Sequence, residues 1–172
     1  LSALAIDVGY LMATRNELQN ISDAAALAGA RQMGKIYAGL DYTEQQNYTL
    51  SAADTALIQN AALGVAAANE AGGQDNIDIA SGEVDIGVWY NHTFTEGLTA
   101  TVNTGSGTLV KKANAVRVIA RRDSVANNPI STFFFSVFGV DEASPTAYAT
   151  ASLTGKKTAG QGELELPVGI DE

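Results

Sequence analysis

Apolar side chains recur at steps of three and four residues through the first 38 positions of the chain. This spacing is typical of one face of an α-helix, and Arg15 is the one polar residue that interrupts it. We place Asp7, Thr14 and Asp23 on the opposite, polar face. No proline occurs in the segment, so one long helix over residues 1–38 is predicted. Its apolar stripe consists of Leu4, Val8, Leu11, Leu18, Ile21, Ala25 and Ala28.

A second helix is predicted over residues of about 50–71. Ser51 or Thr49 stands at the N-cap position, and Asp54 follows Ser51 by three residues, as the acidic residue of a capping box does. The two glycines at 72–73 are a C-terminal stop signal. We expect the two helices to lie against each other.

The period then changes to two, which is typical of β-strands. The predicted strands are 76–80, 84–90, 115–121 and 147–153. Because these strands follow two helices, the sequence predicts an α+β fold. In it, the long N-terminal helix and the second helix pack on an antiparallel β-sheet.

A short apolar helix is predicted between the last two strands. Asn127, Asn128 and Pro129 form a helix-start signal, and the apolar run ends at Gly139. We expect the aromatic side chains of this helix to cover one face of the sheet. They are Phe133, Phe134, Phe135 and Phe138.

The chain therefore divides into three predicted parts. Residues 1–38 form an assembly or anchor helix, and residues 39–154 form the α+β domain. Residues 155–172 are a linker and C-terminal tail, because Gly, Lys and Thr dominate their first half.

The composition excludes several classes of function. The net charge of −9 opposes binding to phosphate backbones, so no nucleic-acid partner is expected. The absence of cysteine excludes disulfides, zinc–thiolate sites and thiol catalysis. Apolar residues make up 46% of the chain while aromatic residues make up 7%, so the core is expected to depend on close approach of small side chains.

The first residues are largely apolar, but Asp7 interrupts them and Arg15 ends them. A membrane-spanning helix needs about 20 apolar residues, and this run is shorter. We expect either a longer membrane helix ahead of Leu1 or a leader removed by processing, and both imply export or anchoring. The alternative is a soluble helix that begins with apolar residues.

Two stretches are similar to one family. The segment Ala3–Ala30 contains AIDVG, LQN, Asp23 and the run AAALA in that order. In this it resembles the N-terminal segment of the TadE/TadG-like proteins of the tight-adherence (Flp) pilus system. Residues 84–95, 113–122 and 129–151 resemble the strand–strand–short helix–strand region that follows in that family.

The resemblance implies a pilin-like architecture at the bacterial cell envelope or extracellular surface. It implies a structural subunit or assembly component of a surface pilus or filament, whose partners are further copies or other pilus subunits. A filament subunit and a membrane-anchored assembly factor both fit. An alternative function is a membrane-anchored adhesin or ligand-binding module that uses the loops around Asn91 and Gly105.

The length of the first helix suggests where contacts would form. Its 38 residues would extend about 55 Å at 1.5 Å per residue, whereas a globule of this size has a radius of gyration of about 16 Å. We therefore expect the N-terminal half to project and its apolar stripe to be covered by lipid or other subunits. The predicted assembly interface consists of Leu4, Asp7, Val8, Leu11, Leu18, Ala24, Ala25 and Ala28.

Asp7 has two interpretations within this interface. It is either a contact that sets the register between subunits, as an acidic residue near a pilin N-terminus provides, or a carboxylate stabilised by the positive end of the helix dipole. At the apolar end of a helix, Asp7 must either find a partner or stay near an interface, because burying a lone charge is costly.

The sequence offers little for catalysis. His92 is the only histidine, cysteine is absent, and neither G-x-S-x-G nor a phosphate-binding P-loop motif occurs. No catalytic residue and no cofactor are therefore expected, and His92 is interpreted as an exposed loop residue.

Two charged clusters remain. Asp75, Asp78 and Glu83 are weak candidates for a Ca²⁺ site, but they lack EF-hand spacing and are better interpreted as solvated residues. A basic cluster could meet an acidic neighbour or lipid headgroups, or could be an ordinary solvated strand face. It consists of Lys111, Lys112, Arg117, Arg121 and Arg122.

Overall fold

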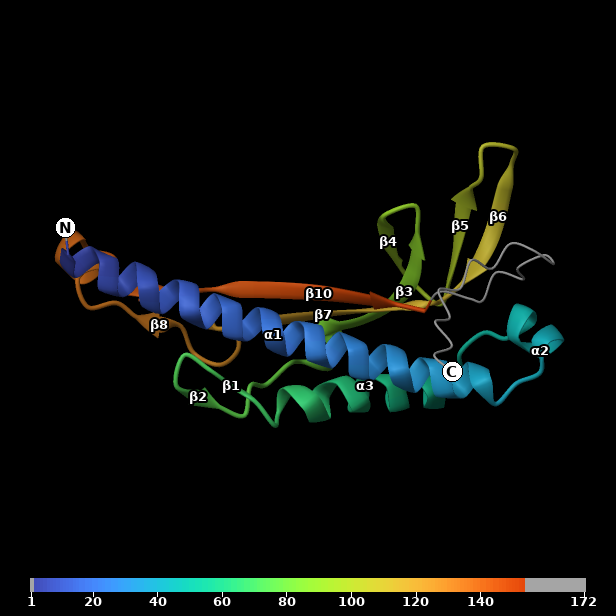
Figure 1. The fold of residues 1–172 in the computed structure, drawn as a ribbon, viewed down its shortest axis with the longest axis horizontal. Coiled ribbons are helices and arrows are strands. Elements are labelled where there is room, and N and C mark those ends of the chain that lie inside the picture. Colours follow the sequence, from blue (N-terminus) through green and yellow to red (C-terminus); the bar gives the residue numbers. More distant parts are fainter. Residues whose placement is uncertain (1, 154–172) are drawn as a thin grey trace, which may run out of the picture.

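The computed structural model describes residues 2–153, which form three helices and a set of short and long strands (Figure 1). The α-helices are α1 (Ser2–Ala38), α2 (Tyr42–Asn47) and α3 (Ala52–Ala66). The 3-10 helices are η1 (Ser81–Glu83) and η2 (Phe135–Phe138). The strands are β1 (Glu70–Ala71), β2 (Gln74–Asp75), β3 (Val84–Tyr90), β4 (Thr93–Glu96), β5 (Thr99–Asn103), β6 (Thr108–Lys112), β7 (Ala115–Arg121), β8 (Ile130–Ser131), β9 (Glu142–Ala143) and β10 (Thr146–Ser152).

The central sheet has four antiparallel strands in the order β10-β7-β3-β4. Both α1 and α3 contact this sheet, and α1 runs along β10 and β7 for most of their length (Figure 1). The predicted α+β fold, with a long N-terminal helix and an antiparallel sheet, is therefore confirmed.

Small residues bring α1 close to the sheet. A Cβ atom added to Gly29 would stand 3.0 Å from Cγ1 of Val116, so the helix backbone lies directly on β7. Around this contact, the core combines one face of α1, one face of α3 and the inward residues of three strands. Its members include Leu18, Ile21, Ala25, Met33, Ile58, Ala62, Ala66, Val84, Ile86, Val116, Val118, Ala147 and Ala149.

The start of α3 follows the predicted chemistry. The Ser51 side chain accepts the N–H of Asp54, and the Asp54 carboxylate accepts the N–H of Ser51. The helix ends at Ala66, however, five positions before the predicted end. Residues 70–75 instead form the β1–β2 hairpin, with Gly72 and Gly73 at positive φ in its turn.

The predicted strand 76–80 is wrong. Ile77 and Ile79 are buried and their neighbours are exposed, so the alternation that suggested a strand is present. The backbone of Asp78, however, binds a side chain instead of a neighbouring strand. Its N–H donates to Oδ1 of Asn127, and its carbonyl accepts from Nδ2 of the same residue, both at 2.8 Å.

The predicted apolar helix after Pro129 is also wrong in extent and in burial. Residues 130–131 form β8, which pairs with β9, and only the 3-10 turn η2 is helical. Phe133 and Phe138 are 77% and 71% exposed, so they do not cover the sheet. The amides of Phe133, Phe134 and Phe135 donate to a side chain of α1, and the helical segment that follows is limited to the four residues of η2.

Candidate assembly surface

A carboxylate of α1 holds the chain before η2. Oδ1 of Asp7 accepts the backbone N–H of Phe133 at 3.1 Å, and Oδ2 accepts those of Phe134 and Phe135 at 2.7 and 2.8 Å. Asp7 is only 4% exposed. Three consecutive amides therefore surround one buried carboxylate, which fixes the N-terminal part of α1 to a segment more than 120 residues away in sequence.

The protonation state of Asp7 follows from this geometry. Burial by itself would raise the pKa of the carboxyl, but the hydrogen bonds from the three amides outweigh burial and lower the pKa below its ordinary value. The side chain is therefore charged at neutral pH. Neither interpretation made from the sequence anticipated a contact within the chain. Of the residues assigned to the polar face, Asp7 and Thr14 are buried, whereas Asp23 is exposed.

A second set of polar contacts joins α1 to the β1–β2 turn. The Tyr10 hydroxyl donates to the carbonyl of Gly72 at 2.7 Å, and the N–H of Gly72 donates to Oε2 of Glu17 at 2.6 Å. Nη1 of Arg122 donates to the same carbonyl at 2.6 Å and to that of Ala71 at 3.2 Å. One glycine thus connects the helix, the hairpin and the end of β7.

Arg122 extends this network in the other direction. Its Nε donates to the carbonyls of Asn127 and Asn128, at 3.0 and 3.1 Å. A buried guanidinium that binds four carbonyls organises several loops at once. Among residues 2–153, no carboxylate forms an ion pair with it.

A pocket of about 380 Å³ lies between these contacts and the surface. Ile6, Asp7 and Tyr10 line it from α1, and Arg122, Ile130 and Phe133 line it from the opposite side. Its wall is mostly apolar, and the Asp7 carboxylate already accepts three amides. The pocket is therefore suited to an apolar side chain.

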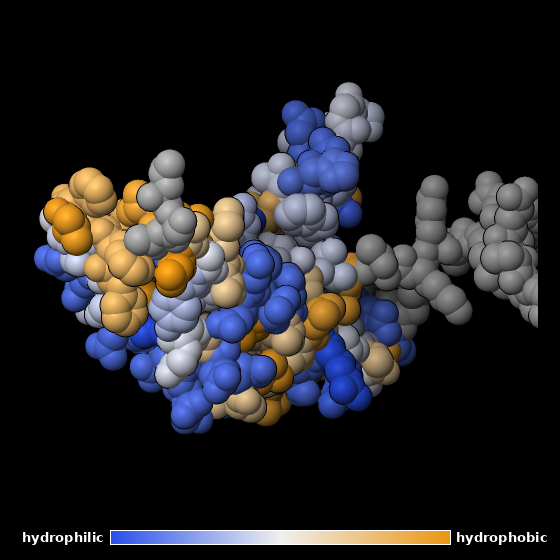
Figure 2. All heavy atoms as spheres, turned by 60° about the vertical axis from the view of Figure 1, so that its left-hand side comes forward, coloured by the Kyte–Doolittle hydropathy of each residue, from blue (hydrophilic) through white to orange (hydrophobic). Residues whose placement is uncertain are grey.

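Exposed apolar side chains occur on two elements that line this pocket and on the chain that follows Phe133. We call the group Ile6, Phe133, Val137, Phe138 and Val140 the apolar end. Val137 is 79% exposed, and Ile6 is more than half exposed. Figure 2 shows hydrophobic side chains gathered over the part of the molecule that contains the start of α1. A contiguous apolar patch of this kind marks a contact site.

The predicted assembly interface is not one exposed face. Leu18 and Ala25 are completely buried in the core, and Asp7 is buried against the three backbone amides that it binds. Val8 and Ala24 are exposed, whereas the remaining predicted residues are half-buried. They are Leu4, Leu11 and Ala28.

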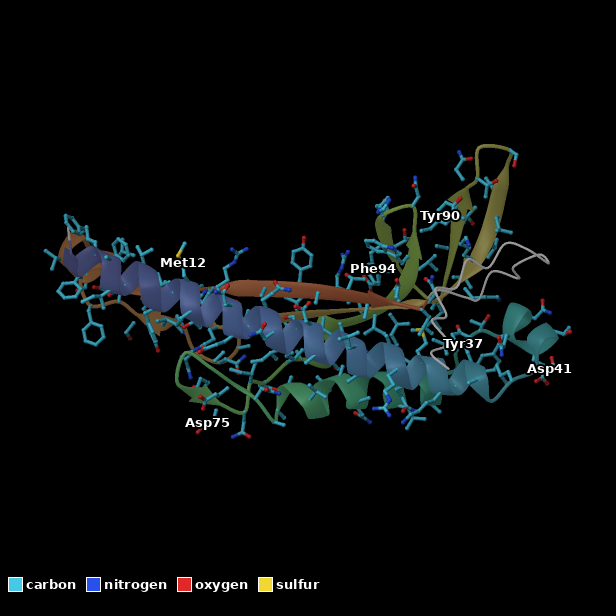
Figure 3. The ribbon with its side chains drawn as sticks, viewed as in Figure 1. Met12, Tyr37, Asp41, Asp75, Tyr90 and Phe94 are labelled. Carbon is cyan, nitrogen blue, oxygen red and sulfur yellow. The ribbon has the colours of Figure 1, made fainter. Side chains whose placement is uncertain are left out.

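The predicted projection of α1 is wrong. Its N-terminal half lies along the β1–β2 turn and along residues 122–135, and the molecule is elongated to match the helix (Figure 1). The expectation had assumed a roughly spherical domain. Some side chains of this half, such as that of Met12, still point away from the rest of the molecule (Figure 3).

The acidic candidates for a metal site do not converge. Glu83 forms an ion pair with Arg121 and accepts the N–H of Ala80. Asp75 lies on the hairpin, away from the sheet (Figure 3), and Asp78 is exposed. Within residues 2–153, no group of three or more His, Asp or Glu side chains is arranged to hold a metal ion.

The basic cluster is also divided. Arg117 lies over the ring of Phe94, with 4.2 Å from Cζ to the ring centroid, and Lys111 lies 5.0 Å from the centroid of Tyr90. Lys112 donates to the Thr49 hydroxyl. Each cation thus has a separate role within the fold. The remaining ionisable candidate, His92, is exposed in the β3–β4 turn at a φ of 61°.

The fold and the site define an elongated α+β protein with an exposed apolar surface at one end of its long helix. Residues 1–32 match the family model "Tad: Putative Flp pilus-assembly TadE/G-like", which confirms the resemblance found in the sequence. No curated protein and no solved structure matches the chain. Of the helices within residues 2–153, none has the length and apolar character needed to cross a membrane.

The family match indicates involvement in the assembly of Flp pili. It points to a structural or assembly role instead of an enzymatic one, and to the cell envelope or surface as its location. The match covers only α1. The sheet domain and the apolar end therefore have to be interpreted from their own geometry.

Proposed function

We propose that this protein is a structural or assembly component of the Flp pilus, and that it binds other pilus subunits through the N-terminal part of α1 together with the apolar end. The observation that carries the proposal is the coincidence of two features. The part of the chain that matches the pilus-assembly family contains Ile6, which belongs to the exposed apolar end, and Asp7, which binds Phe133 of that end.

The polar clamp supports this proposal. Asp7 determines where Phe133 and its neighbours lie, so the helix and the apolar end present one rigid surface. Rigid presentation lowers the entropy lost on binding, which favours a defined protein contact. Aromatic side chains such as Phe133 and Phe138 are the kind that contribute most at the centre of protein interfaces.

The experiment is complementation of a strain in which the gene has been deleted. Val137→Asp and Phe138→Asp place a charge on the apolar end, and both side chains point into solvent, so folding is retained. Val8→Asp does the same on the exposed part of the helix. We expect each variant to accumulate normally while surface pili, counted by electron microscopy, are reduced or absent.

The matched control is Val110→Asp, an exposed valine on β6, which leaves piliation unchanged in this proposal. Normal piliation with Val137→Asp and Phe138→Asp together would overturn the role of the apolar end. Normal piliation in the deletion strain itself would overturn the pilus role altogether.

A second candidate function is an adhesin or ligand-binding module. It is favoured by the β5–β6 hairpin, which extends away from the helices (Figure 1) and exposes Leu109 and Val110. In this case, Val110→Asp would reduce adherence of piliated cells while the number of pili stays constant. The same set of variants therefore separates the two functions.

A further inference from the structure

The outer edge of β10 is not paired with another strand among residues 2–153. β10 is the last strand of the order β10-β7-β3-β4, and it is seven residues long. It contains neither a charged residue nor proline. Natural proteins usually protect a long edge strand with such residues or with a bulge, because an open edge pairs with other chains.

The register with β7 determines which backbone groups face outward. The N–H of Leu153 donates to the carbonyl of Asn114, and the N–H of Arg122 donates to the carbonyl of Pro145. In an antiparallel pair these groups alternate, so odd-numbered residues bind β7 and even-numbered residues face the open edge. The outward residues are Thr146, Tyr148, Thr150 and Ser152.

We propose that a second copy of this chain pairs its β10 with this edge, antiparallel and about a two-fold axis at Ala149. This register places Tyr148 opposite Thr150 of the second copy and Thr146 opposite Ser152, so every outward residue meets another outward residue. The two four-stranded sheets join into one sheet of eight strands.

The position of α1 is compatible with this pairing. A two-fold axis perpendicular to the sheet keeps both α1 helices on the same face. Since α1 packs on β10 and on β7, its axis lies over the line between them. With a strand spacing of about 4.8 Å, the two helix axes are then about 10 Å apart. This is the spacing at which helices pack, roughly 8–10 Å.

The side chains that α1 presents toward the second copy are complementary to themselves. The Gln19 amide donates both to the carbonyl of Tyr148 and to Oδ1 of Asp23, so Asp23 lies on the side of α1 that faces the open edge. Leu27 and Arg31 follow at intervals of four residues along the same ridge, and Leu27 is 63% exposed. Neither Asp23 nor Arg31 forms an ion pair with another described residue.

The helix and the strand give the same two-fold axis independently. Ser22 donates to the carbonyl of Ala147, so these residues lie at one level. Ala149 is two residues further along β10, a distance of about 7 Å. The same distance along α1 corresponds to between about four and five residues. The axis therefore passes near Leu27. With a two-fold axis at Leu27, the Leu27 side chains of the two copies face each other. Asp23 of each copy then lies opposite Arg31 of the other, so the dimer contains two such pairs.

The test is sedimentation velocity on the full chain over a range of concentrations. We expect a dimer with a Kd in the micromolar range, about 1–100 μM, as for an interface of modest size. Asp23→Arg and Arg31→Asp each place like charges opposite each other and weaken the dimer by roughly tenfold or more. The double variant D23R/R31D restores the affinity, because opposite charges meet again.

Rescue by the double variant requires contact between two chains, since residues 23 and 31 are about two helical turns apart within one chain. Thr150→Pro removes a backbone N–H that faces the open edge, so it should also abolish the dimer. Thr150→Ala removes only the hydroxyl that Arg117 binds, and this control should retain the dimer. A chain that stays monomeric to about 0.5 mM overturns the proposal. So does a dimer that is insensitive to Thr150→Pro or is not rescued by the charge exchange.

This surface lies apart from the apolar end, and the inference does not depend on a role in pili. If the dimer forms in solution and all five variants respond as expected, the inference stands even if the deletion strain is fully piliated. Conversely, Val137→Asp should reduce piliation without changing the dimerisation of the chain.

Discussion

The two halves of α1 are attached to the rest of the molecule by different forces. From Leu18 to Met33, the helix is held by apolar burial between α3 and the sheet. Between Leu4 and Leu18, the buried positions are Asp7 and Thr14, and side-chain hydrogen bonds to backbone groups of distant loops hold the helix. One continuous helix thus passes from an ordinary hydrophobic core into a polar clamp.

The difference has consequences for stability. Apolar burial is proportional to area and tolerates small shifts, whereas hydrogen bonds to a carboxylate depend on distance and angle. Damage to the first half should therefore loosen one end of the molecule and leave the core folded. Damage to the second half should unfold the chain.

The largest effect is expected in the second half. Leu18→Ala removes a completely buried side chain and should lower the free energy of unfolding by about 2–5 kcal/mol. Met12→Ala, an exposed position on the same helix, is the control and should change it by less than about 0.5 kcal/mol. Chemical denaturation measures both. Equal effects at the two positions would show that the core does not hold this half of α1.

Gly72→Ala tests the junction between the halves. A Cβ there would stand 2.7 Å from Oγ1 of Thr14 and 2.8 Å from Nη1 of Arg122, at a φ of +56°. We expect a loss of about 1–3 kcal/mol. Gly73 has a similar φ, but the atom nearest to a Cβ added there is 3.9 Å away. Gly73→Ala therefore measures the cost of the positive φ alone. If Gly73→Ala costs as much by denaturation, the close contacts around Gly72 are unimportant.

Asp7→Asn should have a local effect. The amide cannot accept from three N–H groups as the carboxylate does, so the amides of Phe133, Phe134 and Phe135 should exchange faster with deuterium while the sheet stays protected. Asp23→Asn is the control, because Asp23 binds no backbone amide of that loop. Faster exchange throughout the sheet would contradict the proposed separation of the two halves.

The same contact makes the clamp sensitive to acid. The pKa of Asp7 is lowered in the folded state, so its stabilising effect is complete above the unfolded pKa of about 3.9 and is lost as the pH falls through the lower folded value. The protection of the Phe134 amide, relative to its intrinsic exchange rate at each pH, should therefore fall only below about pH 4. A fall in protection between neutral pH and about pH 5 would indicate another group.

The smallest effect is expected outside both halves. His92→Ala changes an exposed turn residue and should alter the free energy of unfolding by less than about 0.5 kcal/mol, with piliation unchanged. A loss of piliation with a stable fold would assign His92 a role that neither half of α1 explains.

The sequence predicted the parts of the molecule that follow local periodicity. The helix over 1–38 and the strands at 84–90, 115–121 and 147–153 each have a strong period, and the structure contains all four. Strand 76–80 failed because the partner of Asp78 is the Asn127 side chain, which no local pattern reveals. The alternation of buried and exposed side chains shows which residues face inward, but it does not show which groups the backbone N–H and carbonyl bind.

The candidate assembly surface was harder to predict from the sequence. Asp7 and Thr14 were assigned to the polar face of α1, but they precede the buried Leu18 by eleven and four residues and therefore lie on the same face of the helix. Only the tertiary contact with residues 133–135 makes burial of a carboxylate favourable. The one signal in the sequence was the phenylalanine-rich run 133–138. This run is too short, and the residues that flank it are too polar, to form a helix of the hydrophobic core.

The connection between β7 and β10 has a consequence for how such proteins can diversify. Arg121 and Thr146 pair directly, although 24 residues separate them, so the intervening chain leaves the sheet and returns to the same place. This excursion contains Phe133, Val137 and Phe138. Its length can change at little entropic cost, because closure entropy grows only slowly with loop length. Replacement of the excursion would give the same scaffold a different partner while the strand register stays intact.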